Sequence, residues 1–249
     1  MQLFQKTRLR YGPLCGSSPK AALPHLYTNV CKTFGGVIGH LDHPSTMKLK
    51  QLEIALSDVD SFDDPKIELE QFPTSAHLAA RMIYVACNTY NDIEGKIIGD
   101  FGCGPGILSI GCSYLGATHV IGFDIDQDAL DTCWVNLRKL DITNIDLIHT
   151  SIPSLQLTQK FDTVVMNPPF GTRNAGIDTI FVAKGLEYAD VVYSLHKSST
   201  REHFYRFANE NNCNVEVVAE LRYDIPKMYK HHKAKSKDIE VDLLRFSRK

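Results

Sequence analysis

The stretch Asn167-Pro168-Pro169-Phe170 has the residue types in this sequence that are best suited to chemistry. It follows residues 163–166, an apolar run that predicts a strand buried on both faces. Pro168 and Pro169 donate no backbone hydrogen bond and fix φ, so they end that strand in a stiff turn. An amide and an aromatic ring therefore stand where the strand emerges. Paired prolines can also simply terminate a strand, so a binding role needs support from the rest of the chain.

The chemistry that this motif favours is the capture of a planar amine. The Asn167 side-chain oxygen and the Pro168 carbonyl can each accept one N–H of such a group. An amine on adenine is a weak nucleophile because its lone pair is delocalised into the ring. Two acceptors would hold its nitrogen in line for attack and favour its rehybridisation. Phe170 can stack on a base turned out of its strand. The predicted catalytic residues are Asn167, Pro168, Pro169 and Phe170.

A glycine-rich turn, DFGCGPG, ends the strand predicted at 96–101. Its glycines allow a tight turn and a close backbone approach at the start of a helix. The next predicted strand, 118–124, ends in Asp124, about twenty residues after the first glycine, where an acidic side chain binds ribose hydroxyls in such folds. This combination predicts a cofactor that carries adenosine. The predicted contacts are Gly102, Gly104, Gly106, Asp124, Ile125 and also Asn167, which would face the cofactor.

The same turn distinguishes between two classes of cofactor. A dinucleotide fingerprint needs a glycine where this chain has Ile107, because the helix must approach the pyrophosphate closely. Asp100 would be badly placed beside phosphates but well placed for the ammonium of S-adenosylmethionine. The residues therefore favour S-adenosylmethionine, with Asp100 as a further contact. The alternative for Asp100 is a cap that only stabilises the loop.

The periodicity predicts an alternation of strands and helices that could position these residues. An apolar helical pattern begins at Met47, and Thr74 or Ser75 can cap the helix that follows. The alternation predicts an α/β fold with a doubly wound, mostly parallel sheet. The ends of its first and fourth strands then lie together, where ligands of open sheets bind. The predicted strands are 96–101, 118–124, 145–150, 161–166, 190–195, 215–221 and 239–246, and the later helices are 106–115, 127–140, 178–188 and 199–211.

Composition narrows the class of protein. The net charge of −2 argues against nucleic-acid binding by bulk positive charge, although it allows a local basic patch. Seven scattered cysteines without a C-x-x-C pair suit free thiols better than disulfides or structural zinc. Residues 1–46 contain basic residues and no acid before Asp42, and we interpret them as a disordered or alternative extension. A mitochondrial transit peptide is the other interpretation, but no amphipathic Arg face supports it. Residues 47–249 form the predicted enzyme domain, with helices in 47–92 and a core at 96–249.

Taken together, the motifs resemble those of class I S-adenosylmethionine-dependent amino-methyltransferases with an [N/D]-P-P-[F/Y/W] motif. More closely, the chain is similar to the methyltransferase-like protein 5 family, the N6-adenosine methyltransferases of eukaryotic small-subunit ribosomal RNA. The HKSSTREH and DIEVDL stretches indicate the family, whereas the NPPF and glycine motifs indicate only the class. The stretches that carry the likeness, between Met47 and Phe246, are LEQFPT, DFGCGPG, GFDID, FDTVVMNPPFGT, YSLHKSSTREH, LRYDIP and DIEVDLLRF.

This resemblance implies a Rossmann-like, seven-stranded sheet with an antiparallel last strand, and methyl transfer to the N6 amine of a ribosomal adenosine. It places Gln71 and Thr74 beside the cofactor. It also puts Ser151 where relatives carry an acidic residue near the cofactor adenine, which could weaken adenine binding. It further implies a heterodimer with a small zinc-binding activator subunit, and a nuclear and cytoplasmic location. The strand at 145–150 would lie at a sheet edge and could add a strand of that partner.

The stretch 227–237, KMYKHHKAKSK, is basic and contains no acidic residue. A charge run of this kind is often a solvated loop. Near a catalytic rim it suits contacts with RNA phosphates better. The predicted RNA-binding residues are Lys227, Lys230, His231, Lys233, Lys235 and Lys237.

Other functions are compatible with parts of the same pattern. A protein glutamine amide would fit the Asn167 and Pro168 acceptors, but enzymes of that kind usually carry a longer helical substrate domain before the core. A DNA adenine methyltransferase would need a target-recognition domain, and none is evident. A non-catalytic binding subunit with this fold is the alternative outside the enzymes. It would have no need to keep both the cofactor loop and NPPF.

Overall fold

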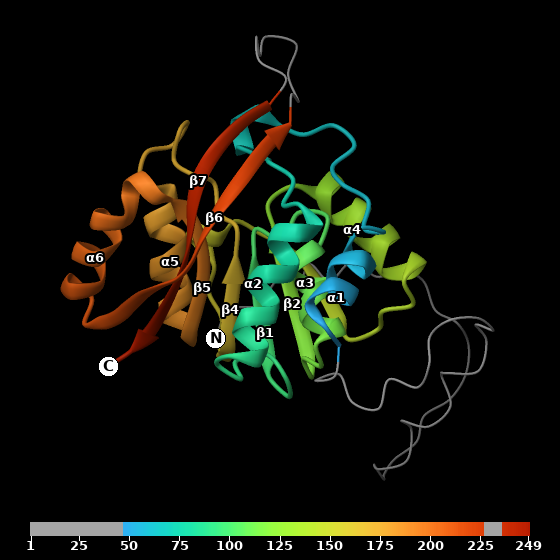
Figure 1. Cartoon of the computed structure of the whole chain (residues 1–249), viewed down its shortest axis with the longest axis horizontal. Helices are drawn as coiled ribbons and strands as arrows, with labels where there is room; N and C mark the ends of the chain where they lie inside the picture. The colour runs from blue at the N-terminus through green and yellow to red at the C-terminus, as the bar shows by residue number, and fades with distance from the viewer. Residues whose placement is uncertain (1–46, 227–235) are drawn as a thin grey trace, which may run out of the picture. The chain divides into compact units, whose positions relative to one another are not determined.

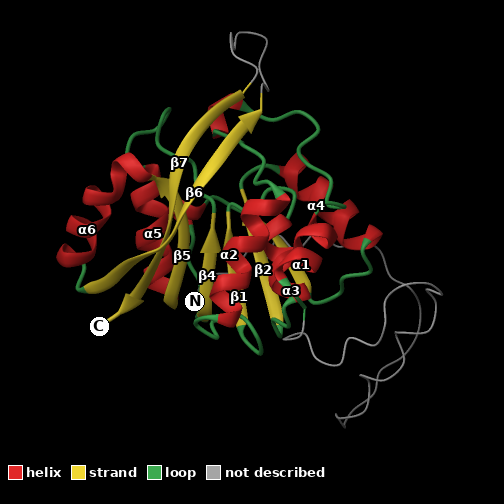
Figure 2. Ribbon diagram, viewed as in Figure 1, coloured by secondary structure: helices red, strands yellow, loops and turns green. Residues whose placement is uncertain are grey.

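The computed structural model describes residues 47–226 and 236–249, with the side chains of residues 223–238 outside the description. Their centre is a seven-stranded sheet in the order β3-β2-β1-β4-β5-β7-β6, with helices against both faces (Figures 1 and 2). The strands are β1 Ile97–Phe101, β2 His119–Asp124, β3 Ile145–His149, β4 Phe161–Met166, β5 Ala189–Lys197, β6 Cys213–Pro226 and β7 Ser236–Arg248. The helices are α1 Leu49–Leu56, α2 Ala76–Asn88, α3 Ile107–Tyr114, α4 Gln127–Lys139, α5 Ile177–Tyr188 and α6 Arg201–Glu210, with short 3₁₀ turns η2 Ile67–Leu69, η3 Ile152–Ser154 and η4 Ser198–Thr200.

The strand pairing confirms the predicted fold class. β1 pairs in parallel with β2 and β4, and the outer pairs β2–β3 and β4–β5 are parallel as well. β7 is inserted antiparallel between β5 and β6. The carboxyl ends of β1 and β4 therefore lie side by side, at the point where the chain order of the sheet reverses.

The last two strands are longer than the predicted ranges 215–221 and 239–246. β7 pairs with β5 only as far as the Lys197↔Val241 pair, whereas its ladder with β6 continues to Pro226↔Ser236. Beyond β5 the two strands form a ribbon held by their own hydrogen bonds (Figure 1). The sequence prediction stopped early because it relied on apolar residues that face a sheet. In the part of the chain that the structure describes, no third strand lies beside this section of the ribbon.

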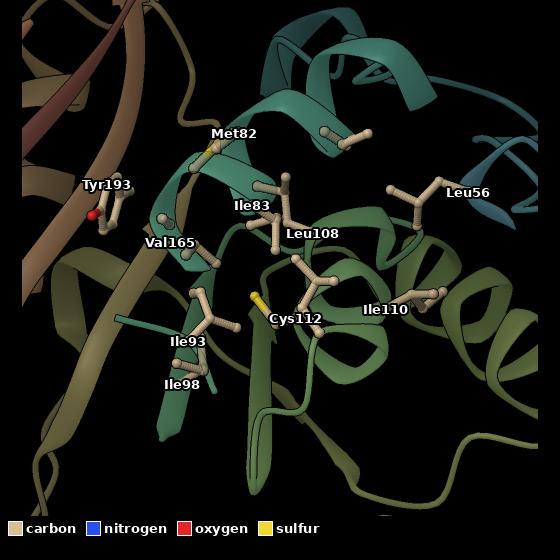
Figure 3. Close-up of a cluster of buried hydrophobic side chains, with 14 of the residues drawn as sticks. Leu56, Met82, Ile83, Ile93, Ile98, Leu108, Ile110, Cys112, Val165 and Tyr193 are labelled. Carbon is tan, nitrogen blue, oxygen red and sulfur yellow. The ribbon is translucent and has the colours of Figure 1, made fainter. Parts of the chain in front are cut away.

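Two apolar clusters fasten the helices to the sheet. One joins α1, α2, α3 and α4 to one face, and Figure 3 shows its centre, where Met82, Ile83 and Leu108 meet Val165. The other joins α5 and α6 to the opposite face. Of the two predicted caps of α2, the structure selects Ser75, whose Oγ accepts the Leu78 N–H at 3.2 Å. The fixed start of α2 also fixes the segment just before it, which lines the site.

Several other properties bear on function. The described cysteines are free and buried. In the described ranges, no group of three potential ligands could hold a metal ion. Among the helices of these same ranges, none is both long and apolar enough to cross a membrane.

Candidate active site

A cavity of about 450 Å³ lies at the carboxyl ends of β1, β2 and β4. This volume falls within the range of roughly 300–1,000 Å³ that is typical of small-molecule sites. Its walls come from segments that are far apart in the sequence: the chain before α2, the glycine turn, the end of β2 and the NPPF motif. The polar or motif residues that line it include Glu70, Gln71, Thr74, Gly102, Gly104, Asp124, Asn167, Pro168 and Phe170.

The glycine turn forms the floor of the cavity. Gly102, Gly104 and Gly106 have φ values of 74°, 52° and 91°, in the left-handed region that side chains other than glycine rarely adopt. A Cβ at Gly104 would lie 2.8 Å from the Phe62 ring, and one at Gly106 would collide with the Cys133 sulfur. Conformation and space therefore both require glycine here, and Gly102 and Gly104 line the cavity.

Asp124 lies at the end of β2 and is buried. One of its carboxylate oxygens accepts the Gly104 N–H at 2.8 Å, and the other accepts the Asp126 N–H at 2.9 Å. Burial raises the pKa of Asp124. Because each carboxylate oxygen has a second lone pair, both can still accept a ligand hydroxyl. The backbone bonds hold the carboxylate in one orientation toward the cavity.

Asp100, at the end of β1, is fully buried behind the glycine turn. Its Oδ2 accepts the backbone N–H and the hydroxyl of Ser109, at 3.0 and 2.6 Å, while its Oδ1 has no hydrogen-bond partner in the described ranges. Burial raises the pKa of Asp100 to about 7. The alternative in which Asp100 caps the loop is thus realised by one oxygen, and the other oxygen is not used by that cap.

Gln71 joins the segment before α2 to the loop after β2. Its Oε1 accepts a hydrogen bond from the backbone N–H of Lys66 at 2.7 Å, and its Nε2 donates to the Asp126 carboxylate at 2.6 Å. Lys66 forms an ion pair with the same carboxylate. Gln71 therefore holds the loop that follows Asp124 as well as lining the cavity.

Asn167 is held by a residue 93 positions earlier in the chain. Its Nδ2 donates to the Thr74 hydroxyl at 2.8 Å. This bond orients the amide, and the Asn167 Oδ1 is left buried at the cavity wall, with no hydrogen-bond partner among the described residues. A buried amide oxygen without a donor is unfavourable, so this position is arranged to receive an N–H from a ligand.

Glu70 is a site residue to which the sequence analysis gave no role. It has a φ of 52°, and its Oε1 accepts the Arg173 N–H at 2.7 Å, just beyond the NPPF motif. Its Oε2 is buried and has no hydrogen-bond partner within the part of the chain that the structure describes. Glu70 thereby ties the catalytic loop to the wall formed by Gln71 and Thr74. An acidic residue directly before Gln71 in LEQFPT was the available signal.

Comparison with known proteins identifies the family. The rRNA N(6)-adenosine-methyltransferase METTL5 of Danio rerio is 51% identical over 205 residues, which span 81% of this chain and 99% of the relative. The chain belongs to the METTL5 family. The Drosophila melanogaster rRNA N(6)-adenosine-methyltransferase is 48% identical, with 80% of this chain and 96% of the relative covered.

Two further comparisons are with other methyltransferases. A solved structure of a candidate RNA methyltransferase from Pyrococcus horikoshii has a TM-score of 0.71 and 34% identity, and the match covers 80% of this chain and 96% of that one. Residues 69–168 match the family model described as ribosomal protein L11 methyltransferase (PrmA). The latter match spans the cofactor end and reaches Pro168, so the LEQFPT and glycine segments are shared with a protein methyltransferase.

In this METTL5-family chain, the structure gathers most of the predicted catalytic and cofactor-binding residues around one cavity. Gln71, Thr74, Gly102, Gly104, Asp124, Asn167, Pro168 and Phe170 line it. Other predicted residues lie outside the lining: Asp100 behind the glycine turn, Gly106 at its end, Pro169 in the NPPF turn, Ile125 exposed after β2, and Ser151 at the start of η3. The predicted RNA-binding residues Lys227, Lys230, His231, Lys233 and Lys235 lie outside the described residues, and Lys237 is described only as backbone in β7.

Proposed function

We propose that this protein transfers a methyl group from S-adenosylmethionine to the N6 amine of an adenosine in small-subunit ribosomal RNA. The observation that carries the proposal is the Asn167 amide, whose Nδ2 is engaged by Thr74 while its Oδ1 is buried and unpartnered. A buried acceptor at this position suits a substrate that offers an N–H. Membership of the METTL5 family supports adenosine in ribosomal RNA as that substrate.

The residues of the cavity fit S-adenosylmethionine. Gly102 and Gly104 bring the backbone of the turn to the cavity wall, and the unpartnered Oδ1 of Asp100, directly behind the turn, suits an ammonium group. The buried Asp124 carboxylate suits a pair of ribose hydroxyls. Bound here, S-adenosylmethionine would supply an electrophilic methyl group on a sulfonium.

The chain's own contribution to the reaction is the positioning of the amine. The Asn167 Oδ1 and the Pro168 carbonyl accept the two N–H groups of the adenine amine and aim the nitrogen lone pair. These bonds strengthen as the nitrogen becomes tetrahedral, which lowers the barrier to attack. Pro168 and Pro169 keep the carbonyl fixed, and the Phe170 ring supports the base. After attack the amine carries a positive charge and is strongly acidic, so it releases its proton to water and no side-chain base is needed in this scheme.

RNA binding would extend beyond the cavity to the basic stretch 227–237. The β6–β7 ribbon leads into this stretch from the end of the sheet that holds the site. Positive charge beside the catalytic rim would attract the phosphates that flank the target adenosine. Neutralising the five lysines of the stretch should weaken RNA binding and flatten its salt dependence. Unchanged binding would remove the stretch from the RNA site.

We also propose a heterodimer with a small zinc-binding activator subunit. Among the described strands, β3 pairs only with β2 and forms one edge of the sheet, with Ile148 partly exposed. Trp134 and Val135 of the neighbouring α4 are also exposed. An open edge beside apolar side chains favours strand addition. Co-expression with such a subunit should increase solubility and activity, whereas a soluble and fully active chain purified alone would contradict the proposal. A nuclear and cytoplasmic location is proposed with it.

The decisive experiment is mass spectrometry of nucleosides from small-subunit ribosomal RNA, with and without this protein. Loss of N6-methyladenosine, restored by the wild-type chain but not by Asn167→Ala, is the expected result. Because part of the chain matches a ribosomal-protein methyltransferase family, methylation of ribosomal proteins should be measured in the same cells. A change there, with N6-methyladenosine intact, would assign a protein substrate instead.

A further inference from the structure

The HKSSTREH and DIEVDL stretches meet at a buried carboxylate. Asp242, fully buried in β7, accepts hydrogen bonds from Arg201 Nε at 2.6 Å and Arg201 Nη2 at 2.8 Å. The Ser198 hydroxyl donates to the same carboxylate at 2.7 Å. The Thr200 hydroxyl closes the turn with a 2.8 Å bond to the Lys197 carbonyl. This network fixes the turn that follows β5, and so fixes the backbone of Lys197.

Lys197 is brought by this turn to the catalytic motif. β5 continues past Ser194, the partner of Met166 at the end of β4, so that Lys197 extends alongside the NPPF turn. Its Nζ lies over the Phe170 ring, 5.7 Å from the centroid. That distance is within the roughly 6 Å of a cation–π contact. A positive charge is therefore held at the ring on which the target base is proposed to stack.

The surroundings of Lys197 differ from those of three lysines that form ion pairs. Lys66, Lys139 and Lys184 each form an ion pair with a carboxylate. In the described part of the chain, the only contact found for the Lys197 ammonium is with the Phe170 ring. A partly exposed ammonium held by a ring alone keeps most of its capacity to bind an anion.

We propose that Lys197 is a positioning residue that binds a backbone phosphate beside the target adenosine. The inference rests on the proposed RNA substrate. A base stacked on Phe170 brings its own phosphodiester to the rim of the cavity, within reach of a long lysine side chain. The ammonium then exchanges the ring for the phosphate and holds the nucleotide while Asn167 aligns its amine.

The test uses the full-length chain and a single-stranded RNA that contains adenosine. Lys197→Met removes the charge and keeps an apolar stem, whereas Lys197→Arg keeps the charge. Lys160→Met is the matched control, because Lys160 is exposed just before β4, at the opposite end of the sheet. RNA affinity is measured by fluorescence anisotropy over a series of salt concentrations. Steady-state methylation and cofactor affinity are measured in parallel.

We expect Lys197→Met to weaken RNA binding about 2- to 5-fold, the effect of a partly exposed ion pair. The slope of log affinity against log salt should shrink by about 0.7, the value for one phosphate on a single strand. KM for RNA should rise with kcat and cofactor affinity little changed, and Lys197→Arg and Lys160→Met should behave as wild type. An unchanged salt slope in Lys197→Met would overturn the phosphate contact, even if activity fell. Absence of salt-dependent RNA binding by the wild type would instead overturn the RNA substrate itself.

Discussion

The hydrogen bond between Thr74 and Asn167 provides the sharpest test of the proposed chemistry. Thr74→Val keeps the volume and β-branching of the side chain but removes the hydroxyl that accepts the Asn167 Nδ2–H at 2.8 Å. Without it the amide can rotate and present its NH₂ to the substrate amine, which would then meet a donor in place of an acceptor. The expected loss is therefore in kcat, with little change in cofactor affinity.

The size of the effect follows from the kind of bond removed. A neutral hydrogen bond contributes about 0.5–1.5 kcal/mol, so kcat of Thr74→Val should fall about 2- to 13-fold. Asn167→Ala removes the acceptor itself and should cost about 10²- to 10³-fold, by analogy with the loss of an oxyanion-hole donor. Thr74→Ser retains a hydroxyl and should stay close to wild type.

The double variant Thr74→Val/Asn167→Ala tests whether Thr74 acts by positioning Asn167 or by a separate effect. If Thr74 acts through Asn167, the double variant should be no slower than Asn167→Ala alone. The assay is steady-state methylation of an unstructured RNA that contains adenosine, with S-adenosylmethionine affinity measured by calorimetry. Additive losses would refute the reasoning, because Thr74 would then act on the cofactor or the fold. A near-normal kcat for Asn167→Ala would mean that the NPPF motif only ends the strand and has no catalytic role.

Three further predictions concern single side chains of the site. Because burial raises the pKa of Asp100 to about 7 and its ionised form suits an ammonium, S-adenosylmethionine affinity should fall by up to about tenfold per pH unit below pH 7. Calorimetry on Asp100→Asn should show no such pH dependence, and a dependence that persists would exclude Asp100 as its source. Asp124→Ala should weaken cofactor binding by about 1.5–3 kcal/mol, the contribution of charged hydrogen bonds, and unchanged affinity in a folded variant would remove Asp124 from the site. Phe170→Leu should lose about 1–3 kcal/mol of base stacking, which would be measured as a higher KM for RNA. Phe170→Tyr keeps the ring and should behave like the wild type. Equal KM values for the two variants would contradict stacking.

The sequence alone determined the parts of the site that depend on local backbone geometry. The left-handed φ values at Gly102, Gly104 and Gly106 follow from a turn that must start a helix beneath a ligand. The strand end at Asn167 follows from two prolines that cannot join a ladder. The alternation of strands and helices determined the doubly wound sheet, and the sheet placed Asp124 and Asn167 at the same edge.

The tertiary structure decided which side chains pair and which are left unpaired. Thr74 bonds to Asn167, which is 93 residues away in the sequence. Lys197 reaches Phe170 because β5 extends beyond the end of β4 and because Asp242, in the last strand, fixes the turn after β5. Complete burial, which raises the pKa of Asp100, depends on how the glycine turn and α3 close over β1. Sequence patterns indicate whether each segment is a helix or a strand, from the spacing of its apolar residues, and where the segment ends in a turn. Contacts between segments depend on register, strand length and packing, so Glu70, Lys197 and the orientation of Asn167 were determined only when the segments came together.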